Sequence, residues 1–101
     1  MSPTNGTIPN KLDTSNKVTT YHIIILPIAY VLVLLDYSYP DYEIVSQLSK
    51  LPCVTEVNRV DGPYDIIVKL SDNNMDAIKV SIGKSMTRIN GIQSTLTLMA
   101  E

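Results

Sequence analysis

The residue best placed for chemistry is Asp65, which follows a glycine turn and stands at the head of a predicted apolar strand. Gly62 opens that turn, where glycine gives the backbone the freedom it needs and lets a small molecule approach closely. The alternative for Asp65 is a local role, in which its carboxylate accepts hydrogen bonds from amides of the turn. The sequence leaves both roles open.

A second group of polar side chains lies near the C-terminus, where Ser94, Thr95 and Thr97 occur in a stretch that alternates with apolar residues. We expect the hydroxyls of Thr95 and Thr97 on the sheet face away from the helices, where they could hydrogen-bond a small polar ligand. Their alternative is simple β-propensity on an exposed or interface face. The candidate ligand-binding residues are therefore Gly62, Tyr64, Asp65, Ser94, Thr95 and Thr97.

Catalytic and metal-binding patterns find little support. The chain has one cysteine, Cys53, and one histidine, His22, far apart in sequence, so they do not form a metal-ligand motif. We expect Cys53 to be a small apolar residue at the start of a strand. There is no glycine-rich phosphate loop and no pair of carboxylates in an apolar setting, and we expect no cofactor.

Composition narrows the class of protein further. The 101 residues suffice for one small domain, and 45% of them are hydrophobic and 18% charged, as in ordinary globular proteins. The formal net charge is −2, with eight basic residues scattered among ten acidic ones. Specific DNA binding needs a cluster of Lys and Arg, so we expect none from this chain alone.

The N-terminal part divides into a polar tail over residues 1–22 and a domain over residues 23–101. The tail has too few apolar residues to bury, so it is expected to be disordered. The apolar run Tyr21–Leu35 is shorter than the about 20 residues that a membrane-spanning helix needs, and its β-branched residues favour a buried strand. A membrane anchor is the alternative for this run, and a cytoplasmic location fits the single cysteine.

Hydrophobic periodicity predicts the elements that position these residues. Strands are expected over Ile28–Asp36, Val54–Asp61, Tyr64–Ser71 and Ile92–Met99. A first helix is expected to begin at Pro40 and to end before Pro52, and a second to be capped within the polar run Asp72–Asn74 and to reach about Ile89. The resulting βαββαβ order predicts an α+β, ferredoxin-like sandwich, with both helices on one face of a four-stranded antiparallel sheet.

The other face of that sheet is expected to carry apolar side chains with no helix over them. Ile67, Met99 and alternate residues of Ile28–Leu35 would lie there. A large uncovered apolar face is unfavourable in a monomer, so the pattern predicts a dimer that packs sheet to sheet about a two-fold axis.

Three segments together resemble a known family. The stretch Val54–Lys69 has a short strand, Gly-x-x-Asp and an apolar strand, Arg88–Leu98 has Gly-Ile followed by Thr-x-Thr, and Ala29–Val33 is an apolar first strand. In this order they resemble the effector-binding (RAM) domain of the leucine- and asparagine-responsive (Lrp/AsnC) transcription regulators, in a stand-alone form without the helix-turn-helix.

The resemblance implies that the chain senses a small molecule, an amino acid or a similar effector. Asp65 would anchor the ligand's α-ammonium group, in clefts that form between dimers, so that one chain supplies part of the site. If the backbone amides of the turn hold a ligand carboxylate, Pro63 would narrow or abolish ligand binding, because proline has no N–H to donate. Higher oligomers of dimers and mixed assemblies with full-length relatives are also implied. The alternatives are an interaction module without a ligand and a small ferredoxin-like dimeric enzyme.

Overall fold

The computed structural model describes residues 26–100 of the chain. Within that range the elements follow in the order β1 (Ile28–Leu35), α1 (Asp41–Ser49), β2 (Val54–Arg59), β3 (Ile66–Ser71), α2 (Met75–Val80) and β4 (Ile92–Ala100). This order confirms the predicted βαββαβ arrangement. The disordered tail predicted for residues 1–22 lies outside the described residues.

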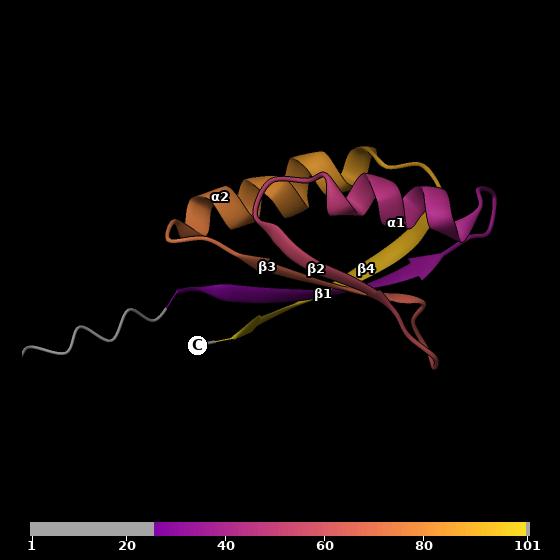
Figure 1. The fold of residues 1–101 in the computed structure, drawn as a ribbon, viewed down its shortest axis with the longest axis horizontal. Coiled ribbons are helices and arrows are strands. Elements are labelled where there is room, and N and C mark those ends of the chain that lie inside the picture. Colours follow the sequence, from indigo (N-terminus) through magenta and orange to yellow (C-terminus); the bar gives the residue numbers. More distant parts are fainter. Residues whose placement is uncertain (1–25, 101) are drawn as a thin grey trace, which may run out of the picture.

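The four strands form one antiparallel sheet in the order β2-β3-β1-β4, with β1 and β3 at its centre. Figure 1 shows α1 and α2 over one face of this sheet, and no helix among residues 26–100 covers the opposite face. The predicted ferredoxin-like sandwich is therefore confirmed. We call the sheet face that packs on the helices the covered face, and the other the open face.

β1 places its side chains in two different environments. Four of them point to the covered face and are 0–3% exposed, namely Ala29, Val31, Val33 and Leu35. The residues between them point to the open face and are only half-buried, because successive side chains of a strand alternate. The apolar run predicted a buried strand, and a single chain fully buries one of the two faces of β1. No helix within residues 26–100 is long and apolar enough to cross a membrane.

The two helices complete the core from the other side. Ile44 and Leu48 of α1 and Ile78 of α2 are fully buried against the covered face. Asn74 caps α2, since its side-chain oxygen accepts a hydrogen bond of 2.9 Å from the amide of Asp76. The cap fixes where the second helix begins, as the run of polar residues before it predicted.

The helix changes its winding beyond α2. Residues Ser81–Ser85 form a π turn and Met86–Arg88 a 3-10 turn, so the helix predicted to reach Ile89 is correct in extent but not in its regularity. Ser81, which is 1% exposed, donates a hydrogen bond of 2.6 Å from its hydroxyl to the carbonyl of Pro52. This bond satisfies a buried hydroxyl and joins the π turn to the loop between α1 and β2.

The register of β4 corrects the prediction for its threonines. Thr95 pairs with Val33 and Thr97 pairs with Val31 across antiparallel strands. Directly opposed residues of such strands point to the same face, so both threonines lie on the covered face and not on the open one. Met99, which was expected on the open face, pairs with Ala29 and lies on the covered face as well.

The reason for this reversal is a bulge near the start of β4. Leu34 pairs with Ser94 and the next residue of β1, Leu35, pairs with Ile92, which leaves Gln93 as an extra residue. An extra residue moves the side chains of all later residues in the strand to the opposite face of the sheet, because side-chain alternation has a period of two. Ile92 therefore packs against the core while the threonines that follow shift to the same face.

β2 and β3 are shorter than predicted, which lengthens the loop that carries Asp65. The strands were expected over Val54–Asp61 and Tyr64–Ser71, and the loop between them now runs over residues 60–65. The amide of Val60 donates to the carbonyl of Asp65 at 2.9 Å and closes this loop. Asp65 thus lies in the loop, directly before the first residue of β3.

Candidate functional site

A polar cavity lies where β1 ends beside the β2–β3 loop. Its volume is about 160 Å³, and we call it the rim cavity. It is lined by Leu35, Tyr37, Asp41, Arg59, Val60, Asp61, Asp65 and Ile66. Three of these side chains are acidic and one is basic, so the cavity has a net negative charge and suits a cation.

Asp65 is held in the rim cavity by two hydrogen bonds from outside its own loop. Its Oδ2 accepts a bond of 2.8 Å from the amide of Leu35, at the end of β1. Its Oδ1 accepts a bond of 2.6 Å from the hydroxyl of Tyr37, in the loop that follows β1. The carboxylate is therefore bonded across the sheet rather than within its turn. Each oxygen has two lone pairs, so Asp65 retains the capacity to accept further donors.

The same bonds keep Asp65 ionised. The Leu35 amide lowers the pKa of the Asp65 carboxyl below its ordinary value of 3.8, and the Tyr37 hydroxyl adds to the effect. In turn, the hydrogen bond to Asp65 raises the pKa of the Tyr37 phenol above its ordinary value of 10.0. At neutral pH the pair is thus a neutral phenol that donates to a carboxylate.

Arg59 also faces the rim cavity, but an acidic neighbour engages it. Its guanidinium forms an ion pair with the carboxylate of Asp41 at the start of α1. Both side chains are partly exposed, and pairs of this kind contribute little to stability. The pair neutralises the one basic group of the lining, so Asp61 and Asp65 determine the sign of the charge that a ligand meets there.

Gly62 and Tyr64 belong to the same loop as Asp65 but line neither of the cavities described here. The backbone of Gly62 has a φ of +144°, a conformation that glycine adopts readily and other residues rarely do. A Cβ atom at this position would meet nothing within 4 Å, so there is open space beside the loop. Glycine is therefore needed here for backbone shape, as predicted.

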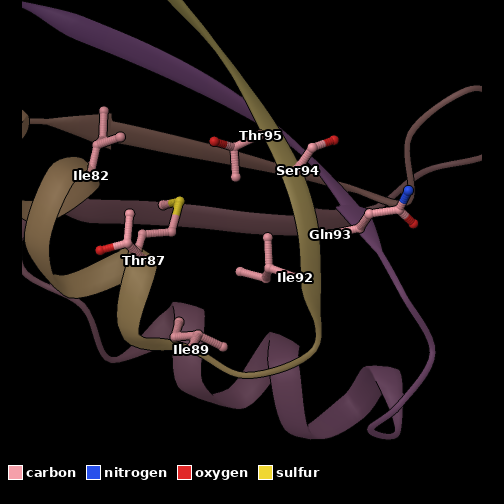
Figure 2. A pocket seen from close by; sticks show the side chains of 8 residues that line it. Ile82, Thr87, Ile89, Ile92, Gln93, Ser94 and Thr95 are labelled. Atoms are coloured by element: carbon pink, nitrogen blue, oxygen red, sulfur yellow. The ribbon is translucent and has the colours of Figure 1, made fainter.

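A second cavity lies between the helical segment after α2 and the edge strand β4, and we call it the edge cavity. Its volume is about 210 Å³, and its lining is Ile82, Met86, Thr87, Ile89, Ile92, Gln93, Ser94 and Thr95. All eight side chains are uncharged, and half of them are apolar. Figure 2 shows Ile92 and Thr95 pointing toward the helical side of β4, whereas Gln93 and Ser94 point away from it.

The structure divides the predicted site residues between these two places. Asp65 lines the rim cavity, Ser94 and Thr95 line the edge cavity, and Thr97 lines neither. Asp65 and Ser94 lie on opposite sides of β1, so two strand spacings, or roughly 10 Å, separate their backbones. One chain therefore does not bring all predicted residues around one small ligand.

Sequence reasoning missed Tyr37 and Arg59. Tyr37 was not among the candidate residues, yet its φ of +63° is unusual for a residue other than glycine, and its hydroxyl donates to Asp65. No sequence signal announces this long-range contact. Arg59 could have been found, since it precedes the glycine turn on the strand that leads to Asp65.

Cys53 has the structural role that the sequence predicted. It lies directly before β2 and packs against the hydrophobic core. Burial raises the pKa of its thiol above the ordinary value, and the charge of Asp72 acts in the same direction. A protonated thiol is a weak nucleophile and a poor metal ligand. Among residues 26–100, no group of His, Cys, Asp and Glu side chains is arranged to hold a metal ion.

Comparison with known proteins gives relatives that match this fold. An uncharacterised helix-turn-helix-type transcriptional regulator of Pyrococcus furiosus, PF0250, is 30% identical over 58 residues, which cover 57% of this chain and 39% of the relative. The crystal structure of the hypothetical protein PHS023 from Pyrococcus horikoshii is 27% identical with a TM-score of 0.67, and the match covers 74% of this chain and 89% of that one.

A third relative is similar in fold alone. The structure of the transcriptional regulator NMB0573 from Neisseria meningitidis, determined as a complex with L-Met, is 16% identical with a TM-score of 0.64. The match covers 86% of this chain and 62% of that one, so this chain spans less than two thirds of the length of either NMB0573 or PF0250. The family model described as the Lrp/AsnC ligand binding domain matches residues 28–100. The chain therefore belongs to the Lrp/AsnC ligand-binding domain family.

Proposed function

We propose that this chain is an oligomerising regulatory module that binds a small-molecule effector, an amino acid or a similar molecule. The observation that carries the proposal is Asp65 in the rim cavity. Its carboxylate stays ionised at neutral pH, in a small, negatively charged cavity of a domain from a ligand-binding family. The α-ammonium group of an amino acid is a cation with three donors, which such a carboxylate binds well.

We place the rest of the proposed site in two parts. Gly62 and Tyr64 would border the ligand on the loop side, and the hydroxyls of Ser94, Thr95 and Thr97 would supply hydrogen bonds from β4. β1 separates Asp65 from these hydroxyls within one chain. A ligand that contacts both groups is proposed to lie between protomers. The uncharged edge cavity would then receive the apolar part of a ligand whose charged part is held by a neighbour's rim cavity.

Assembly follows from the open face of the sheet. Its apolar side chains come from the three strands β1, β3 and β4, namely Ile28, Tyr30, Leu32, Leu34, Ile67, Leu96 and Leu98. Leu96 and Leu98 are 44% and 49% exposed in the single chain. A contiguous apolar surface of this kind marks an interaction site, and a second copy packed sheet to sheet covers it on both partners. A dimer, and rings of dimers, are the proposed assemblies.

The proposed role is regulation of transcription in the cytoplasm through partners. PF0250 is named as a helix-turn-helix regulator, and NMB0573 was crystallised with L-Met. This chain would form mixed assemblies with full-length relatives and would not bind DNA itself. The basic residues of the domain are spread over several elements and their ends, namely Lys50, Arg59, Lys69, Lys79, Lys84 and Arg88. The domain is proposed to begin at residue 23, after a polar tail.

A thermal-shift screen with each of the twenty amino acids tests this function. A ligand at about a hundred times its Kd stabilises the folded state by about 2.7 kcal/mol, which gives a clear rise in Tm. The variant Asp65→Asn keeps the size of the side chain and an acceptor for the Leu35 amide, but it removes the charge. Asp76→Asn is the matched control, because Asp76 is exposed on α2. We expect the shift to be lost in the first variant and kept in the second.

The screen also separates the alternatives. If no amino acid raises the Tm, the chain is better described as an interaction module without this class of ligand. If a shift occurs and survives in Asp65→Asn, the ligand binds elsewhere, and the edge cavity becomes the leading site. Conversion of an added compound to a product would instead revive the alternative of a small enzyme.

A further inference from the structure

Tyr37 occupies part of the hydrogen-bond accepting capacity of the Asp65 carboxylate, which the proposed ligand needs. Its hydroxyl donates to Oδ1 of Asp65 at 2.6 Å, while the other carboxylate oxygen accepts from the amide of Leu35. The Leu35 amide belongs to the backbone of the sheet and stays in place. The phenol belongs to an exposed side chain in a loop, since Tyr37 is 67% exposed, and it is the donor that can leave.

The backbone at Tyr37 favours such a release. Its φ of +63° is a left-handed conformation, which is unfavourable for a residue with a side chain. The conformation persists where surrounding contacts determine it, and the bond to Asp65 is one of these contacts. If a ligand replaces the hydroxyl, the loop between β1 and α1 becomes free to leave the strained conformation.

We infer that Tyr37 determines the specificity of the site, because its hydroxyl competes with the ligand's ammonium group for the carboxylate of Asp65. This inference rests on the proposed function and adds the residue that controls it. An ammonium group has a full positive charge and three donors, whereas the phenol offers one neutral donor. A primary ammonium therefore displaces the hydroxyl, while a neutral alcohol or amide exchanges one neutral hydrogen bond for another and gains little.

The surroundings of the pair agree with this selection. Asp61 and Asp41 also line the rim cavity, and Arg59 is engaged by Asp41. The net charge that an entering group meets is therefore negative, which favours cations and disfavours free carboxylates. Tyr37 thus selects for charged amines, which displace its hydroxyl from Asp65, over neutral polar molecules, which do not.

The test measures binding of ethylammonium chloride, the simplest probe with a primary ammonium on a carbon chain. The full chain is labelled with 13C and 15N, and the Asp65 carboxyl carbon and the Leu35 amide are followed by NMR during the titration. The variant Tyr37→Phe removes the hydroxyl and keeps the ring. Tyr42→Phe is the matched control, since Tyr42 is equally exposed, at 68%, and lies on the neighbouring helix α1. Sodium chloride at equal ionic strength corrects for screening.

We expect Tyr37→Phe to bind ethylammonium at least about twofold more tightly than the original chain, which is the low end for one hydrogen bond. Tyr42→Phe is expected to match the original chain. Equal binding in all three proteins would overturn the inference. Weaker binding in Tyr37→Phe would overturn it as well, because the hydroxyl would then be a partner of the ligand and not its competitor.

The outcome is independent of the amino-acid screen. If no amino acid stabilises the chain and Tyr37→Phe still binds ethylammonium more tightly, the proposed effector class is wrong and the role of Tyr37 stands. If an amino acid stabilises both proteins equally and ethylammonium binds both equally, the effector function stands and the role of Tyr37 is wrong. An N-acetylated form of a stabilising amino acid, which lacks the ammonium group, should produce no shift in either protein.

Discussion

The two faces of the sheet are built from the same strands but differ in how far the chain itself buries them. On the covered face, Val31 and Val33 of β1 and Val68 of β3 are 0% exposed under the helices. On the open face, Leu32 of β1 and Leu96 of β4 are opposed in register and remain accessible, with Leu96 44% exposed. Both faces are apolar, so the chain buries one of them under its own helices, and the proposed dimer would bury the other. The difference separates residues that fold the domain from residues that are proposed to assemble it.

The largest expected effect comes from a charge on the covered face. Val33→Asp places a carboxylate among fully buried apolar side chains, which should destabilise the domain by more than about 4 kcal/mol. Domains of this size have stabilities near the low end of about 5–15 kcal/mol, so we expect a largely unfolded chain. Circular dichroism and a two-dimensional NMR spectrum measure this directly. A cooperative thermal transition at the Tm of the original protein would contradict it.

An aspartate introduced one residue earlier, in place of Leu32, should have a different result. Leu32→Asp puts the charge on the open face, where the side chain is only half-buried. We expect the domain to stay folded while the proposed dimer dissociates, so that light scattering gives the chain mass of 11.2 kDa instead of twice that value. Ser46→Asp, on the exposed side of α1, is the control that should leave the dimer intact. A dimer that survives Leu32→Asp would refute sheet-to-sheet packing.

A smaller effect is expected where the start of β4 meets α1. Gly91 has a φ of +99°, and a Cβ atom there would lie 2.8 Å from Cδ1 of Ile44. Gly91→Ala should therefore destabilise the domain by about 2–4 kcal/mol, from the strained backbone and the overpacked contact together. Gly83→Ala is the matched control, because a Cβ atom at Gly83, within the π turn, would meet nothing within 4 Å. Urea unfolding should show the control within about 1 kcal/mol of the original, or slightly more stable.

Much of the covered face could be predicted because its signals are local. Ile66, Val68 and Leu70 occupy every second position of the strand expected over Tyr64–Ser71, and in the structure all three are buried on the same face of β3. Asn74 and the polar residues before it marked the start of α2 for the same reason, since capping depends on adjacent residues. Patterns that depend on a few neighbouring residues can be read from one sequence.

The open face and the site depend on register, which one sequence does not contain. No residue pattern between Ile92 and Thr97 predicts a bulge at Gln93. That single extra residue places Thr95 and Thr97 on the covered face instead of the open face. Asp65 was recognised as important, but its contacts with Leu35 and Tyr37 join residues about thirty positions apart. Such contacts arise only when strands pair, so the division of the site between two cavities could not be foreseen.

The smallest effect concerns the rim where the two faces meet, and it depends on pH. In the folded chain the pKa of Asp65 is lowered, so its contribution to stability is present above its ordinary pKa of 3.8 and is lost as the pH falls through the lower folded value. The pKa of Tyr37 is raised, so its contribution is present below its ordinary pKa of 10.0 and is lost as the pH rises through the higher folded value.

The difference in unfolding free energy between the original chain and Tyr37→Phe should therefore be constant at intermediate pH and decrease at both low and high pH. It should shrink under acid conditions as Asp65 gains its proton, because a neutral carboxyl accepts a weaker hydrogen bond than a carboxylate. It should shrink again under alkaline conditions, where the ionised phenol no longer donates. Guanidinium unfolding across the pH range gives the difference at each point, and Tyr42→Phe supplies a baseline. A difference that stays constant at every pH would mean that the ring of Tyr37, and not its hydroxyl on Asp65, holds the loop at the rim.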